Sequence, residues 1–580
     1  MATTLAVVTG LLAGLGAVGF RYMIRGFGWL FFNRGAHLLE FLGDYYVIVL
    51  PVAGGLLVGA IIYFLAREAK GEGPPEVMEA VAIGGGRIRQ RVALVKSLAS
   101  SICIGSGGSV GREGPMVHIG ASIGSTIGQR FNMSEDWTKT LLLCGAAGGI
   151  SATFNAPLGG ILFALEIVER KFVGRNFAFI LVSSIAADLL AHSLLGSDPS
   201  FVIPDYSMYS YWEIPAYIAL GVLAGLAAVA FGRFFFLCQD FFKVTLHKVP
   251  GYAKPAIGGL TVGVIGFFYP YIFGVGYGRS YGPGGELTSL GGADLALLGQ
   301  IGFFTLLIWM VLKIVATSAT LGSGGSGGVF APSLFIGSML GGAFGLAFHD
   351  VFPAVAGPVP DAAGSYALIG MGAFFAAVVH GPMTAIILLF EMTRNYNLIL
   401  PLMTAVIVSY AVARTLNRES IYTMGLARRG VDIHRRAQTD ALEAVTVGEV
   451  MTRDFPTVLP STTLPQLMDR FHESGHHGFP VVDEWGDLYG IVTLEDVEKA
   501  TPHKDLPLTI ADIATRSPVV AYPDQSVKEA LGQLGGRHVG RIPVVDRTYP
   551  NRLLGVLRRR DVVTAYVEAM SAKPARNRVT

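Results

Sequence analysis

Charge is the scarcest property of this chain: Asp, Glu, Lys and Arg make up 15% of its 580 residues, against 52% hydrophobic residues. A soluble domain carries about 25% charged residues. With a mean hydropathy of +0.52, the composition predicts a membrane protein. The net charge of +2 gives no basic excess, so we expect no nucleic-acid partner.

Cysteine is also rare. The three residues Cys103, Cys144 and Cys238 lie in apolar segments, and an odd number in such surroundings predicts no disulfide framework. No Cys, His or carboxylate cluster has the spacing of a metal site, and no catalytic constellation is evident, so we expect neither a metal nor an enzyme. The N-terminus lacks a basic region before its apolar run, so we interpret residues 3–32 as a first membrane helix, not a signal peptide.

Glycine, by contrast, is abundant, and the segment 105–115, GSGGSVGREGP, places Arg112 and Glu113 among glycines between two apolar runs. Ionisable residues at membrane depth usually face an aqueous pathway. Pro115 indicates the first turn of a new helix, and a helix N-terminus offers amide donors to a small anion. Glu113 is itself a tethered anion, so it can compete for that site until a proton neutralises it.

An internal repeat supports a transport pathway. Residues 96–115 align without gaps on 313–332, an offset of 217, and 154–168 align on 379–393, an offset of 225. Seven of the eleven positions in 105–115 and 322–332 are identical. Repeated broken helices predict a duplicated membrane domain with a site at the interface of the repeats.

Composition changes near residue 446, where two similar soluble halves begin, each with short β-type runs and an amphipathic helix. We therefore predict a membrane domain at 1–430, a linker at 431–446, α/β modules at 447–500 and 508–570, and a disordered tail at 571–580. Basic residues in 414–430 predict that the C-terminal modules lie in the cytoplasm, and we expect the bilayer to be the cell (inner) membrane.

Four motifs together resemble the CLC family of chloride channels and chloride/proton antiporters. They are GREGP at 111–115, GxFxP at 328–332, the helix start Asn155-Ala-Pro157, and Tyr422 after the last membrane run. The resemblance covers roughly residues 3–430, and the C-terminal modules resemble a CBS-domain pair. It implies an all-α polytopic membrane domain of two inverted repeats with broken helices, an α/β cytoplasmic tandem CBS module, and a homodimer in the lipid bilayer.

The resemblance also assigns residues to a chloride pathway. Glu113 matches the gating glutamate, the helix starts at Glu72, Gly73, Arg112, Gly114, Val329 and Phe330 match the anion-binding elements, and Tyr422 matches a hydroxyl that contacts the central anion. Chloride is the expected bound species, and no other cofactor is required.

Two residues depart from the family pattern. The family's inner motif is GSGIP, whereas GEGPP here puts Glu72 at the serine position. A carboxylate about 5 Å from chloride would cost roughly 3 kcal/mol at an effective dielectric near 20, so Glu72 must be protonated, turned away or paired. We expect acid to increase flux through Glu72 as well as Glu113.

The second departure concerns the internal proton path, where antiporters carry a glutamate directly after the position of Glu166 and this chain has Ile167. Because an aliphatic side chain carries no proton, the residue favours a channel. The alternative is a chloride/proton antiporter in which Glu166 or Glu169 substitutes. A nucleotide-sensing membrane receptor without transport is an alternative from another class. In the CBS pair, Thr493 and Asp496 form the T-x-x-D pattern that holds adenosine ribose, and the second module keeps Asp561 but has Arg558 in place of the threonine. The resemblance thus admits ATP, ADP or AMP, against a purely structural pair.

Overall fold

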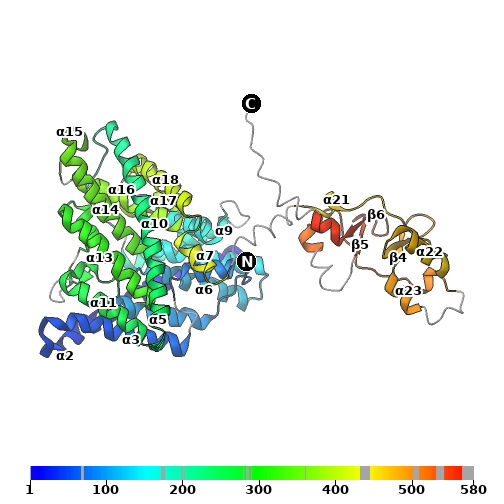
Figure 1. Cartoon of the computed structure of the whole chain (residues 1–580), viewed down its shortest axis with the longest axis horizontal. Helices are drawn as coiled ribbons and strands as arrows, with labels where there is room; N and C mark the ends of the chain where they lie inside the picture. Colours follow the sequence, from blue (N-terminus) through cyan, green and yellow to red (C-terminus); the bar gives the residue numbers. More distant parts are fainter. Residues whose placement is uncertain are drawn as a thin grey trace. The chain divides into compact units, whose positions relative to one another are not determined.

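A computed structural model describes residues 2–66, 71–171, 177–196, 200–201, 203–278, 280–281, 287–288, 290–359, 361–431, 445–500, 508–530 and 541–564. The predicted tail at 571–580 and most of the predicted linker lie outside these residues. The chain forms two compact units, Met1–Val431 and Asp432–Thr580, which we describe separately (Figure 1).

The first unit is helical, and eight of its described helical segments are long and apolar enough to cross a membrane. Its principal helices are α1 (Ala2–Trp29), α3 (Tyr46–Leu65), α4 (Pro74–Ala82), α5 (Gln90–Gly105), α6 (Glu113–Arg130), α7 (Glu135–Phe154), α8 (Pro157–Leu162), η4 (Phe163–Glu169), α9 (Phe177–Leu195), α10 (Ile214–Val244), α11 (Lys254–Phe268), α12 (Gly292–Leu297), α13 (Phe303–Gly322), α14 (Phe330–Val351), α16 (Asp361–Val379), α17 (Pro382–Thr393), α18 (Ile399–Leu416) and α19 (Ile421–Ala427). Shorter elements are η1 (Leu30–Gly35), α2 (Ala36–Leu38), η2 (Glu40–Tyr45), η5 (Tyr211–Glu213), η6 (Pro270–Ile272), β1 (Ser280–Tyr281), β2 (Leu287–Thr288) and α15 (Pro353–Ala356).

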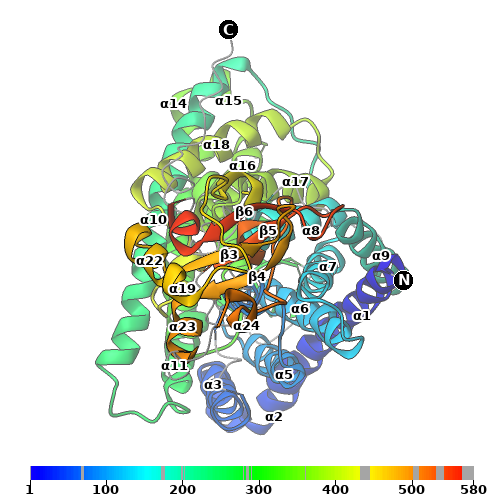
Figure 2. The same cartoon turned by 90° about the vertical axis from the view of Figure 1, so that its right-hand side faces the viewer.

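The predicted duplication is visible in how these helices pack. In the first half α6 lies against α7, and α1 against α7 and α9; in the second half α14 lies against α16, and α10 against α16 and α18. The blue-to-cyan helices of the first half and the green-to-yellow helices of the second occupy different sides of the unit (Figure 2). Two half-units therefore repeat one packing pattern.

Hydrogen bonds between the halves follow the same offset as the sequence repeat. Ser100 Oγ lies 2.8 Å from Ser326 Oγ, and Ser109 Oγ lies 3.4 Å from Thr317 Oγ1. Because Ser100 aligns with Thr317 and Ser109 with Ser326, these are two copies of one contact. The backbone nitrogens of Gly111 and Gly328 each donate to the other's carbonyl, at 2.7 and 2.8 Å, in an antiparallel bridge. The halves are thus inverted repeats that meet at these glycines.

The second unit contains two α/β halves of matching construction. Its elements are α21 (Val447–Val450), α22 (Leu464–Ser474), β3 (Gly478–Val482), β4 (Leu488–Thr493), α23 (Leu494–Ala500), α24 (Ile510–Ile513), β5 (Arg541–Val545) and β6 (Leu553–Arg558). Each half has an antiparallel strand pair with one register shift, after Val481 in β3 and after Val544 in β5.

The cores of the two halves exchange their first residues. Val447 packs with the core of the second half, beside Ile542 and Leu557, while Ile510 packs with the core of the first half, beside Phe479. Backbone bridges Thr452–Val556 and Ile491–Thr515 make the same exchange. Because the first segment of each half packs in the core of the other half, the pair forms one folded unit.

Candidate functional site

The site of the membrane unit lies where three helix starts converge. The Gly111–Gly328 bridge brings together the starts of α6 and α14. The start of α4 touches the same place, since a Cβ atom on Gly114 would lie 2.1 Å from the carbonyl oxygen of Glu72, and one on Gly73 would lie 2.2 Å from the carbonyl oxygen of Gly114. Gly73 also has a φ of 104°, which favours glycine. Glycine is required here because backbone lies directly on backbone.

Glu113 occupies this junction and is fully buried. Its Oε1 accepts a hydrogen bond from the Tyr277 hydroxyl and lies 3.7 Å from Arg112 Nε. A Cβ atom on Gly111 would lie 2.5 Å from Glu113 Oε2 and 3.0 Å from the Ala331 nitrogen. The carboxylate therefore sits beside the first amides of α14, at the place where amide donors would meet a small anion.

Tyr277 is a site residue that the sequence reasoning missed. It lies in the glycine-rich segment after α11, is buried, and has the Arg112 guanidinium 5.4 Å from the centre of its ring. No local pattern distinguishes it from the other tyrosines of that segment, because its partners Arg112 and Glu113 are more than 160 residues earlier in the chain. Its hydrogen bond holds the Glu113 carboxylate in the junction.

Val329 and Phe330 open α14 on the other side of the junction, and both are buried. The Phe330 ring packs against three other rings, Phe154, Phe163 and Phe375, with centroid separations of 5.1, 6.1 and 4.2 Å. Phe330 aligns with Glu113 in the sequence repeat. At this equivalent position the side chain fills an aromatic core, and the backbone alone faces the junction.

Tyr422 and Glu72 complete the group. Tyr422 lies on α19, which packs on α4, and its buried hydroxyl has no hydrogen-bond partner among the described residues. The carboxylates that act on it electrostatically are Glu72 and Glu113. Glu72 is 7% exposed, and its Oε2 also lacks a partner in the described part of the chain. Two buried polar groups without hydrogen-bond partners among the described residues thus accompany Glu113.

Glu166 and Ile167 lie elsewhere, on η4. Glu166 accepts hydrogen bonds from the backbone nitrogens of Met383 and Thr384, at 3.1 and 2.6 Å, at the start of α17. Its repeat equivalent Glu391 does the same for Leu158 and Gly159 at the start of α8, at 3.0 and 2.7 Å. Both carboxylates therefore cap helix N-termini. Ile167 is buried, and a Cβ atom on Gly381 would lie 2.9 Å from it.

This arrangement can exchange one anion for another at a buried set of amide donors. Helix N-termini stabilise negative charge without a full positive charge, so a small anion can bind and still leave. A carboxylate at these donors would exclude a dissolved anion. Protonation removes the charge that holds the carboxylate there.

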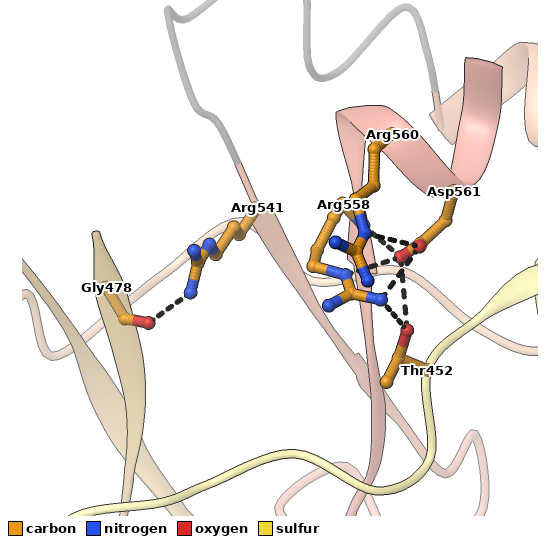
Figure 3. A network of polar contacts seen from close by, with 6 residues as sticks. All are labelled: Thr452, Gly478, Arg541, Arg558, Arg560 and Asp561. Atoms are coloured by element: carbon orange, nitrogen blue, oxygen red, sulfur yellow. Dashed lines mark hydrogen bonds and ion pairs between the residues drawn. The ribbon is translucent and has the colours of Figure 1, made fainter. Parts of the chain in front are cut away.

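The C-terminal unit has a second candidate site at the end of β4. Asp496 Oδ2 accepts hydrogen bonds from Thr493 N and Oγ1, at 2.8 and 2.7 Å. Thr493 pairs with Gly478 in the sheet, and Arg541 donates a hydrogen bond to the Gly478 carbonyl (Figure 3). An acidic turn and a guanidinium from the other half of the unit therefore lie close together.

The equivalent turn in the other half is closed by an ion pair. Arg558 donates from Nε to Asp561 Oδ2 and from Nη2 to Asp561 Oδ1, both at 2.9 Å, and Arg558 Nη2 reaches Thr452 at 2.5 Å (Figure 3). Asp561, predicted from sequence as a nucleotide ligand, is thus occupied by its own neighbour. The surroundings are basic: burial, with Arg541, Arg558 and Arg560, holds the pKa of His476 below its ordinary value.

Inverted repeats, broken helices that converge on a glycine-lined junction, and a buried glutamate there define a membrane transport protein for a small anion. Residues 54–414 match the family model described as voltage gated chloride channel, and residues 447–502 and 510–568 match the CBS domain model. The chain belongs to the CLC family and is a multi-pass membrane protein with a C-terminal CBS pair, as the motifs predicted. Membership places its function in anion transport and favours this over the receptor alternative.

The chain is similar to relatives named as chloride channels and to relatives named as exchange transporters. A putative chloride channel protein ClcB-like from Ralstonia nicotianae is 34% identical over 438 residues, which cover 74% of this chain and 98% of that protein. The H(+)/Cl(-) exchange transporter ClcA from Vibrio parahaemolyticus is 32% identical over 431 residues, 70% of this chain and 87% of that protein.

Solved structures extend the similarity to the whole fold. A slow cyanobacterial Cl−/H+ antiporter matches with a TM-score of 0.65 at 27% identity, over 74% of this chain and 97% of that one. A eukaryotic CLC transporter matches with a TM-score of 0.61 at 21% identity, over 97% of both chains, and this second likeness concerns the fold alone.

Proposed function

We propose that the membrane unit exchanges chloride for protons through Glu113. The observation that carries the proposal is the position of this carboxylate, which is buried at the junction of the α6 and α14 starts and hydrogen-bonded by Tyr277. A carboxylate in this place couples proton uptake to anion binding. When it takes up a proton it loses its charge and leaves the amide donors, which can then bind chloride. The exchange transporters among the relatives support coupled exchange over the passive conduction that Ile167 predicts from the sequence.

Passive conduction is the second candidate, favoured by two observations. Ile167 is buried and aliphatic, and Glu166 is engaged at the start of α17. With neither residue available, a channel needs only that Glu113 leave the junction. The name of the Ralstonia relative also says channel.

Simultaneous recording of chloride and proton movement in proteoliposomes separates the two candidates. Under an outward chloride gradient, an exchanger drives protons uphill into the vesicles, and a channel moves chloride alone. In Glu113→Gln, which cannot release a proton, we expect proton movement to fall by about 100-fold while chloride still crosses. Chloride flux without proton movement in the unmodified protein would overturn exchange and leave conduction.

We also propose a homodimer with one pathway per subunit, which the family resemblance implies. Crosslinking of the detergent-solubilised protein should give a dimer band and no higher species. Mixed dimers of unmodified and Glu113→Gln subunits should retain half of the proton flux if each subunit works alone.

A further proposal concerns the CBS pair, namely that an adenine nucleotide binds at the turn of Thr493 and Asp496. Three features support it: the paired turn, the Arg541 guanidinium next to the Gly478 partner of Thr493, and the cluster of Arg541, Arg558 and Arg560. Burial and the two neighbouring arginines lower the pKa of Arg541, so a polyphosphate would relieve repulsion among like charges. Asp561 is not part of this proposal, because Arg558 neutralises it.

Thermal shifts with ATP, ADP and AMP test the proposal. ATP and ADP should raise the midpoint more than AMP if the arginines hold phosphate, and Asp496→Asn should remove the shift. Equal midpoints with and without all three nucleotides would leave the CBS pair as a structural module.

A further inference from the structure

Coupled exchange requires a proton donor for Glu113 on the side where the chain leaves the membrane unit, and the inference below rests on the proposed exchange. Ile167 is aliphatic, and Glu166 is held by three hydrogen bonds at the start of α17. Glu391 caps α8 in the equivalent way, which shows that the Glu166 contact belongs to the repeated architecture. Because Glu166 is engaged in this way and Ile167 is aliphatic, another ionisable residue is the better candidate for the proton path.

Glu72 is a buried carboxyl group whose charged form would disfavour anion binding at the neighbouring site. It is 7% exposed, and Oε2 has no hydrogen-bond partner among the described residues. A charged carboxylate near bound chloride opposes binding by Coulomb repulsion. A carboxylic acid does not, and its proton can be donated.

Two observations place Glu72 near Glu113. Its backbone carbonyl lies against Gly114, the residue after Glu113. The unpaired Tyr422 hydroxyl lies within electrostatic range of both carboxyls. A hydroxyl donates and accepts at once, so Tyr422, or a water beside it, can link the two.

On its other side Glu72 adjoins a partly exposed ion pair. Glu76 Oε1 lies 2.9 Å from Arg429 Nη1, and the Arg429 side chain is 45% exposed. Both act electrostatically on Glu72, together with Lys96, whose Nζ donates to the Gly71 carbonyl at 2.5 Å. Arg429 lies two residues before the end of the membrane unit at Val431, so this pair faces the side from which the chain exits.

We propose that Glu72 relays protons between the Glu76–Arg429 side and Glu113. The acid form of Glu72 gives its proton through Tyr422 or water to the Glu113 carboxylate, which becomes neutral and leaves the anion site. Glu72 is left as a carboxylate, which a hydronium ion from solvent on the Glu76–Arg429 side reprotonates. One O–H bond breaks and one forms in each step, and the net change is one proton moved inward or outward.

The groups that face Glu72 set the direction of its response to pH. They are Glu76 on α4, Lys96 on α5, Tyr422 on α19, and Arg429 after it. From α6, Gly114, the residue after Glu113, lies against the Glu72 backbone, and His118 lies beside Gly73. Lys96 and Arg429 stabilise the carboxylate that remains after transfer, while Glu76 opposes it. Raising the pH on this side should slow proton delivery, since reprotonation of Glu72 becomes slower.

The test compares coupling in proteoliposomes for the full chain, Glu72→Gln, Glu72→Asp and Glu391→Gln. Glu72→Gln keeps the shape but cannot carry a proton, so we expect its proton flux to fall by about 100-fold while chloride flux persists. Glu72→Asp should restore part of the proton flux. Glu391→Gln removes a carboxyl that lies at the α8 start, and the proton-to-chloride ratio should be unchanged.

The outcomes separate this relay from the exchange proposal. If the unmodified protein moves no protons, exchange itself fails. If it moves protons and Glu72→Gln moves them at the same ratio, the relay is wrong and exchange stands. If Glu72→Gln loses chloride and proton flux together, the residue is needed for the pathway's structure, and the relay is equally rejected.

Discussion

The two helix starts at the centre of the membrane unit have the same backbone and different side chains. Gly111 and Gly328 bond to each other, and the following residues open α6 and α14 in equivalent ways. At the third position of each start, one copy has Glu113, held by Tyr277 and Arg112, and the other has Phe330, packed among aromatic rings. Duplication thus builds the set of amide donors twice, while only one copy carries a titratable group.

The comparison separates duplicated features, which hold the proposed pathway together, from single ones, which carry its proposed response to protons. The glycine junction, the Ser100–Ser326 pair and the two carboxylate caps occur in both halves. Glu113 and Glu72 occur in one half only. We therefore expect changes to duplicated features to affect folding or flux as a whole, and changes to the single features to affect coupling.

The largest effect should come from closing the shared junction with Gly114→Ala. The added methyl group would lie 2.1 Å from the Glu72 carbonyl oxygen and 3.0 Å from the Gly328 Cα, and backbone atoms cannot move aside as a flexible side chain can. We expect loss of chloride flux in proteoliposomes. Gly19→Ala on α1 is the matched control, because nothing lies within 4 Å of its added Cβ. Normal flux in Gly114→Ala would contradict the convergence of the helix starts.

The next effect sharpens the contrast between Glu113 and its equivalent Phe330. Truncating a buried aromatic side chain costs about 3–5 kcal/mol, so Phe330→Ala should lower the thermal midpoint of the solubilised protein strongly. Because its backbone amide remains, the protein that stays folded should keep the unmodified proton-to-chloride ratio. Glu113→Gln should behave in the opposite way, with a small change in midpoint and loss of coupling.

The helix caps made by Glu166 and Glu391 allow a comparison of the two halves in stability as well as in geometry. Replacing a side chain that caps a helix costs about 1 kcal/mol, so Glu166→Ala and Glu391→Ala should lower the midpoint by similar amounts. Neither should change the proton-to-chloride ratio. A selective loss of proton flux in Glu166→Ala would return Glu166 to the proton path and weaken the case for Glu72.

The smallest effect should come from the C-terminal unit, where the turn at Thr493 and Asp496 can be compared with the equivalent turn at Arg558 and Asp561. Arg558→Thr would give the second half the T-x-x-D pattern of the first and release Asp561 from its ion pair. If the Thr493–Asp496 turn binds nucleotide, this variant should show an additional increase of the thermal midpoint with AMP, whose single phosphate depends least on the arginine that is lost. Conserving the unmodified shift would indicate that the second turn stays closed for another reason.

The class of protein and the repeat could be predicted from the amino-acid sequence alone, and the same residues led to the hypothesis that Glu113 is a protonatable gate. Scarce charge is read from the composition, and glycine-rich breaks followed by proline are local patterns. The repeat is found by comparing such local patterns at offsets of 217 and 225. The change of composition near residue 446 and the family resemblance predicted the CBS pair, and the departure from the family's inner motif singled out Glu72.

Which distant residues contact each other follows from the tertiary fold. Tyr277 reaches Glu113 across more than 160 residues, Glu166 is directed to the start of α17, and Val447 packs in the core of the other CBS half. No short-range spacing encodes such contacts, because they arise when separate helices and strands bury their surfaces against each other. The residue type determines that a carboxyl group can bind a proton or accept hydrogen bonds. Whether it caps a helix, closes an anion site or relays a proton depends on the residues that surround it in the folded protein.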